Sequence, residues 1–73
     1  MASVAAAQKV VDEILETIEE LSDSVKLKAA DYFESVEERA KSIMENVEKR
    51  DSASDAQMTA LNNMLEGGEK WRK

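Results

Sequence analysis

Cysteine, histidine and proline are absent from this sequence of 73 residues. Without His and Cys the chain lacks the most common general base and the best side-chain nucleophile, so we expect that it is not an enzyme. A carboxylate-bridged di-metal site in a helical bundle usually includes His as well as Glu, and the sequence has no glycine-rich phosphate loop. We therefore expect no catalytic residues, no metal and no cofactor.

Glycine and aromatic residues are scarce, with two Gly and one each of Phe, Tyr and Trp. The common residues, such as Ala, Glu, Lys, Leu and Met, are good helix formers, whereas β-branched and aromatic residues are too few for a sheet. No apolar run approaches the roughly 20 residues that span a bilayer, and the N-terminal segment is too short and polar for a secretory signal. The composition predicts one all-α domain over residues 1–73 with no membrane partner.

Apolar residues recur at spacings of three and four in two long segments, which is the pattern of amphipathic helices. The first segment predicts a helix over about residues 3–21, with Ser3 as its N-cap. The second predicts a helix over residues 25–50. Between them, Ser22-Asp23-Ser24 favours a tight turn over a kinked continuation, because each of these side chains can cap a helix.

A third, shorter helix is predicted over residues 55–66. Ser54 and Gln57 have the spacing of a capping box. Gly67 and Gly68 indicate the end of this helix, since glycine adopts the left-handed C-terminal conformation at little cost. Residues 69–73 are then predicted to form a flexible tail.

These elements predict an antiparallel helical hairpin with a third short C-terminal helix, which is a small three-helix bundle. A chain of this size usually gains only about 3–5 kcal/mol from its single core, and it has no disulfide to add to that. The second helix is also longer than either neighbour. We therefore expect a homodimer or a higher oligomer.

Acidic residues outnumber basic residues by 16 to 10, which gives a net charge of −6. Direct binding to nucleic acid is disfavoured, because nucleic acid is itself a polyanion. Residues 12–23 contain six acids and no base. This strip is either a docking face for a protein partner with a basic surface or the solvated face of a helix. Its candidate partner-binding residues are Asp12, Glu13, Glu16, Glu19 and Glu20.

Trp71 is the only tryptophan, and it lies in a basic segment that follows the two glycines. Aromatic residues anchor many protein interfaces, so Trp71 is a further candidate partner-binding residue. The alternative is that Trp71 folds back to cover the core. If the third helix continues through the glycines, Trp71 falls on the same face as Leu61 and Met64.

A pattern runs through the C-terminal half, beginning with Phe33 to Ala40 and Ile43. It ends with Ser54-Asp55-Ala56-Gln57, Ala60-Leu61, Asn63-Met64, Gly67 and Lys70-Trp71. Over about residues 33–71 this pattern resembles small, mostly uncharacterised helical proteins of bacteriophages and prophages, although Gly68 stands where they more often have an apolar residue. The resemblance implies a phage or mobile-element origin and action in the cytoplasm of a bacterial host.

Together these features predict a small acidic protein-interaction module. Phage proteins of this size often inhibit host defence, so the resemblance implies an inhibitor that covers a site on a host defence or nucleic-acid-binding protein. One alternative is a homo-oligomeric scaffold or assembly protein. A second alternative is a regulatory accessory subunit.

Overall fold

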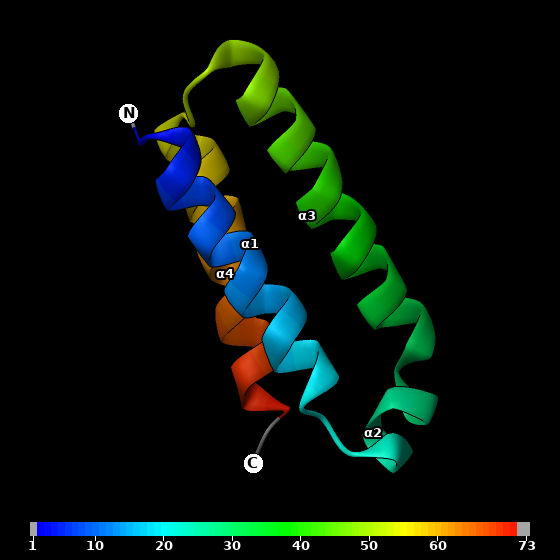
Figure 1. Cartoon of the computed structure of the whole chain (residues 1–73). Helices are drawn as coiled ribbons and strands as arrows, with labels where there is room; N and C mark the ends of the chain where they lie inside the picture. Colours follow the sequence, from blue (N-terminus) through cyan, green and yellow to red (C-terminus); the bar gives the residue numbers. More distant parts are fainter. Residues whose placement is uncertain (1, 72–73) are drawn as a thin grey trace.

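The computed structural model describes residues 2–71, and Figure 1 shows helices joined by short connections. The four helices among the described residues are α1 (Val4–Glu19), α2 (Asp23–Lys28), α3 (Ala30–Arg50) and α4 (Asp55–Lys70). The prediction of an all-α fold is confirmed, since the described part of the chain contains no β-strand. No helix within residues 2–71 has the length and apolar character that a membrane crossing requires.

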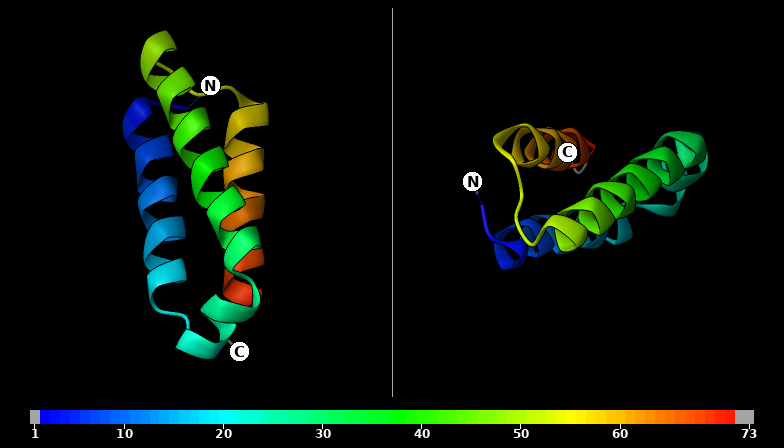
Figure 2. Two further views of the ribbon diagram at one scale, coloured as in Figure 1. Left: turned by 90° about the vertical axis from the view of Figure 1, so that its right-hand side faces the viewer. Right: turned by 90° about the horizontal axis from the view of Figure 1, so that it is seen from above.

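The long helices form a bundle in which α1 and α4 lie side by side and run in the same direction (Figures 1 and 2). α3 runs back across them in the opposite direction. α1 packs against both α3 and α4, whereas α3 and α4 touch each other at few points. The predicted hairpin is present as α1 and α3, but the C-terminal helix has 16 residues, as many as α1, and covers mainly α1.

Serine side chains begin three of the helices. Ser3 and Ser22 accept hydrogen bonds from backbone N–H groups three residues later, at 3.1 and 3.4 Å. Ser54 and Gln57 form the predicted capping box, in which each side chain accepts a hydrogen bond from the other residue's backbone N–H, at 3.2 and 2.9 Å. The turn before α2 occupies residues 20–22, slightly earlier than predicted.

The predicted helix over residues 25–50 is interrupted at Ala29, which separates α2 from α3. Ala29 has φ −120° and ψ 28°, outside the helical region. Its N–H still donates to the Val25 carbonyl, and its carbonyl still accepts from the Phe33 N–H, each at 3.0 Å. The chain therefore changes direction without losing either hydrogen bond of Ala29, and neither Gly nor Pro marks the position in the sequence.

α4 does not end at the glycine pair. The predicted helix over residues 55–66 continues through both glycines to Lys70, so the predicted end was wrong. Neither glycine has a positive φ. The first two residues of the predicted tail (69–73) are helical, and its last two lie outside the described residues.

The reason for the two glycines is close packing against neighbouring helices. A Cβ atom at Gly68 would lie 3.3 Å from Cγ2 of Thr17 on α1. A Cβ atom at Gly67 would lie 3.2 Å from the hydroxyl oxygen of Tyr32 on α3. Both distances are shorter than ordinary carbon contacts, so the missing side chains let α4 approach its neighbours closely.

One end of the bundle, which we call the closed end, contains the first turn of α1 and the connection between α3 and α4. The backbone N–H of Ala2 donates to the carbonyl of Ala53, and the reverse hydrogen bond also forms, each at 2.8 Å. Ala7, Val47 and Ala53 have no exposed surface there. Small side chains thus allow the helices to meet at this end.

Toward the other end, α3 diverges from α1 and α4 (Figures 1 and 2). The core continues between the diverging helices and includes the only Phe of the chain. The buried apolar side chains of the described residues are Ala7, Val11, Ile14, Ile18, Leu21, Phe33, Val36, Ala40, Met44, Val47, Ala53 and Leu61.

Candidate protein-binding surfaces

Three of the predicted acidic residues lie along one side of α1, next to the last turn of α4. Glu13, Glu16 and Glu20 are spaced by three and four residues, which places them on one side of a helix. With Glu69 of α4 they line an open hollow of about 320 Å³, together with Thr17 and Leu65. We call this site the acidic hollow.

Glu69 was missed by the sequence analysis because its position depends on the end of α4. A helix that stopped at residue 66 would leave Glu69 in a tail. The continuation of α4 through the glycines carries this carboxylate to the side of α1. One sequence signal could have located Glu69. If the apolar spacing of α4 is extended past the glycines, Glu69 falls within the helix and not in a tail.

The other two predicted acids lie elsewhere. Asp12 and Glu19 are each one residue before a glutamate of the hollow, which turns them about 100° from that neighbour, although each is only one turn of α1 from Glu16. Neither lines the acidic hollow. The Gln8 amide nitrogen donates to a carboxylate oxygen of Asp12 at 2.8 Å. The acidic strip is thus wider than the acidic hollow, and only part of the strip lies next to α4.

The acidic hollow concentrates negative charge on the surface. Its lining, within residues 2–71, contains four carboxylates and no Lys or Arg. No three acidic groups of the described chain are arranged to hold a metal ion. Exposed charges of one sign that are gathered in a hollow raise the local concentration of counter-ions and attract groups of the opposite sign. The charge of this surface is therefore complementary to that of Lys and Arg side chains.

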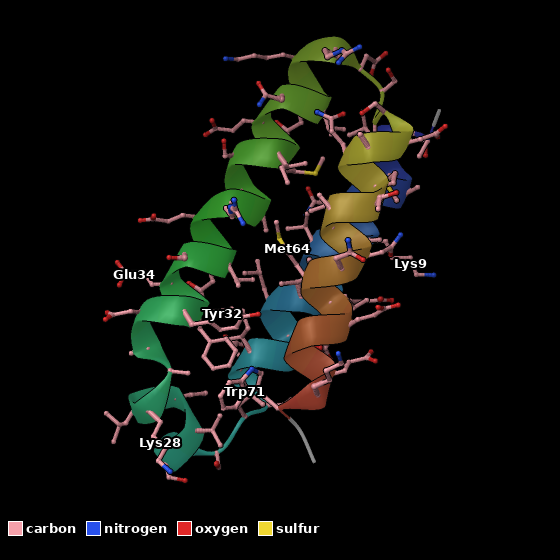
Figure 3. The ribbon with its side chains drawn as sticks, turned by 180° about the vertical axis from the view of Figure 1, so that it is seen from behind. Lys9, Lys28, Tyr32, Glu34, Met64 and Trp71 are labelled. Atoms are coloured by element: carbon pink, nitrogen blue, oxygen red, sulfur yellow. The ribbon has the colours of Figure 1, made fainter. Side chains whose placement is uncertain are left out.

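The three aromatic residues of the chain form a single cluster between α3 and the end of α4 (Figure 3). The ring of Phe33 lies 5.2 Å from that of Tyr32 and 5.8 Å from that of Trp71, both edge to face. The Tyr32 and Trp71 rings are 6.4 Å apart. Such arrangements contribute about 0.5–1.5 kcal/mol per pair beyond area burial.

Trp71 has structural features of both alternatives that the sequence left open. Its ring contacts buried Phe33, as expected for a side chain that covers the core. It also remains 41% exposed, as expected for an interface anchor. Part of the indole is therefore available to a partner.

The large apolar side chains that are exposed within residues 2–71 all gather near Trp71. They are Leu27, Tyr32 and Trp71, with 81%, 47% and 41% of their surfaces exposed. All three line a second open hollow of about 560 Å³, whose other lining residues are Lys28, Ala29, Ala30 and Asp31. We call this site the apolar end. Sequence reasoning missed Leu27 and Tyr32 because it treated residues 25–50 as one continuous helix.

A narrow crevice lies behind the apolar end, among α1, α3 and α4. It leaves no room for a water molecule, so it is a packing feature and not a ligand pocket. Its lining residues are Ile14, Ile18, Tyr32, Phe33, Val36, Met64, Leu65 and Gly68.

Comparisons of the chain with protein-family models, with curated proteins and with solved structures gave no significant match. Function must therefore be inferred from the two surfaces themselves. The acidic hollow and the apolar end differ in chemistry, and each suits a different kind of contact.

Proposed function

We propose that this chain is an inhibitory binding protein whose acidic hollow covers a basic surface of another protein. The observation that supports the proposal is the convergence of Glu13, Glu16, Glu20 and Glu69 from two helices on one hollow. Carboxylates and phosphates are both anionic acceptors that bind Lys and Arg through charge-assisted hydrogen bonds. A nucleic-acid-binding protein is thus the partner that fits, and this chain would displace its nucleic acid.

The overall charge supports the same proposal. A net charge of −6 on 73 residues attracts a basic partner before contact and raises the rate of association. A binding role also fits a composition that includes neither His nor Cys. We propose no catalytic step for this chain.

We extend the proposal to the setting in which the inhibitor acts. The resemblance of residues 33–71 to small phage and prophage proteins implies a bacterial host. The proposed partner is therefore a host protein of defence or of nucleic-acid metabolism, bound in the cytoplasm.

Affinity capture of the full chain in bacterial lysate, followed by mass spectrometry, tests the proposal. The first variant removes three charges from the acidic hollow. The control removes three exposed charges from α3, so that both variants have the same net charge. The substitutions are Glu13→Gln, Glu16→Gln and Glu20→Gln in the first variant, and Glu34→Gln, Glu38→Gln and Glu45→Gln in the control.

We expect the first variant to lose a captured nucleic-acid-binding protein that the wild-type chain and the control both retain. With the purified partner, the first variant should also fail to displace nucleic acid. Equal capture by both variants would contradict the role of the hollow. Equal loss from both would mean that net charge alone is responsible.

A further inference from the structure

The apolar end contains a helix that adds little to the core, because only Val25 of α2 packs against the buried cluster. None of the six residues of α2 is buried. Leu27 points its apolar surface into solvent, and Tyr32 and Trp71 expose part of theirs beside it. From the exposed fractions and the usual area of such side chains, the uncovered apolar surface is on the order of 300 Å². Patches of this size on a small protein often mark interaction sites.

We propose that a second copy of this chain covers the apolar end and forms a two-fold symmetric dimer. The distribution of charge favours this occupant. Residues 4–22 contain five acids and one Lys, so two copies repel each other wherever these segments meet. Residues 23–32, which form most of the apolar end, contain two Asp and two Lys, and their formal charge is zero. Contact at this segment therefore adds less repulsion between two acidic copies than contact at the segments of α1.

The charges at the apolar end are also self-complementary. In a two-fold interface the same patch is used by both copies. Lys28 and Asp31 are exposed, have opposite charges and line the same hollow. A two-fold axis near this site pairs Lys28 of each copy with the partner's Asp31. Ala29 and Ala30 lie between these residues, and their small side chains leave room for the partner's Leu27.

The dimensions of the molecule set the expected strength of the dimer. The described chain measures 38 × 19 × 16 Å, so its end has a cross-section of roughly 300 Å². A stable protein interface of standard size buries about 800 Å² per partner. We therefore expect a weak dimer in exchange with monomer at micromolar or higher concentrations. This dimer does not depend on the proposed function, because the acidic hollow lies outside the contact.

Sedimentation analysis of the full chain over a micromolar to millimolar concentration series tests the dimer. Leu27→Glu places a charge in the contact and should raise the dimer dissociation constant at least tenfold. Ser42→Glu adds the same charge on an exposed position of α3 and should leave the constant unchanged. Because Leu27 lies outside the core, the circular dichroism spectrum of Leu27→Glu should match that of the wild-type chain.

A mixing experiment tests the two-fold pairing. Lys28→Asp alone places two acids opposite each other in the dimer, and Asp31→Lys alone places two bases opposite each other. Each variant should dimerise at least tenfold more weakly than the wild-type chain. An equimolar mixture restores both opposite-charge pairs and should form a heterodimer. A mixture that stays monomeric would overturn the pairing.

Two further results would overturn the dimer itself. One is a wild-type chain that remains monomeric throughout the series, which would leave the apolar end to a different protein. The other is a dimer that Leu27→Glu does not weaken. Failure of the lysate capture would affect neither result, since capture concerns the acidic hollow.

Discussion

The closed end and the apolar end are formed by the same long helices but differ in nearly every physical respect. At the closed end Ala7, Val47 and Ala53 are fully buried, and backbone hydrogen bonds tie Ala2 to Ala53. At the apolar end the side chains are large, the helices diverge, and Leu27 and Trp71 face solvent. The difference teaches that helices meet closely where the side chains between them are small, and that apolar surface stays exposed where the helices diverge.

The largest expected effect comes from the same substitution made in each half of the molecule. Leu61 lies in the half of α4 nearer the closed end and has no exposed surface, so Leu61→Ala should lower the free energy of unfolding by about 2–5 kcal/mol. Leu27→Ala should change it by less than about 0.5 kcal/mol, because Leu27 is exposed. Urea denaturation followed by circular dichroism, at concentrations below dimerisation, measures both. Equal losses would contradict the comparison.

An intermediate effect is expected at Trp71. Removing a buried Trp costs about 3–5 kcal/mol, and about half of that is expected here because the ring is partly exposed but contacts Phe33. Trp71→Phe keeps an aromatic ring at this position and should recover most of the loss. The free energies of unfolding of Trp71→Ala and Trp71→Phe, each compared with that of the wild-type chain, test this expectation. A loss below about 0.5 kcal/mol for Trp71→Ala would show that the aromatic cluster does not stabilise this end.

The two glycines offer a finer test of how closely α4 packs. Alanine in place of glycine within a helix gains up to about 1 kcal/mol. At Gly67 the new Cβ meets only the hydroxyl of half-exposed Tyr32, which can move, so Gly67→Ala should stabilise the protein. At Gly68 the new Cβ atom meets buried, β-branched Thr17, which cannot move easily. Gly68→Ala should therefore destabilise the protein by about 1 kcal/mol. Melting temperatures that rise for both variants would mean that α1 and α4 pack less closely than the short distance between Gly68 and Thr17 indicates.

The smallest effect is expected from the two serine caps at opposite ends. Ser54→Ala removes the capping box at the start of α4 and should cost about 1 kcal/mol. Ser22→Ala removes the cap of α2, which has no buried residue, so α2 should fray without lowering the stability of the bundle. Denaturant midpoints of the two variants test this. A larger shift for Ser22→Ala would show that α2 is coupled to the core.

The parts of the fold that depend on local chemistry were predictable from the sequence. α1 begins at its predicted cap, and the capping box at Ser54 and Gln57 starts α4, because both arise from residues within one turn. The break at Ala29 was not predictable, since alanine favours a helix and loses no hydrogen bond there. The glycine pair was read as a helix end, because only the tertiary structure shows Thr17 and Tyr32 beside it.

The same distinction applies to the candidate sites. Helical spacing was enough to group Glu13, Glu16 and Glu20 on one side of α1. Spacing alone does not separate Asp12 and Glu19 from this group, because each is one turn from Glu16; only the position of α4 shows that they lie outside the hollow. Glu69 joins the acidic hollow because α4 continues past the glycines, whereas Leu27 joins the apolar end through the orientation of α2, which follows from the break at Ala29.

The parallel pairing of α1 and α4 has a further consequence for the acidic hollow. Each helix has a macrodipole whose C-terminal end bears a partial negative charge. α1 and α4 end side by side, and each end already has a cation: the Lys26 ammonium donates to the Glu19 backbone carbonyl at 2.8 Å, and Lys70 lies in the last turn of α4. Glu16 and Glu69 nevertheless add carboxylates where two negative helix ends meet, so these lysines offset only part of the negative charge. A Lys or Arg side chain of a bound partner would reduce the remaining repulsion, so binding of a basic partner would stabilise this end of the bundle.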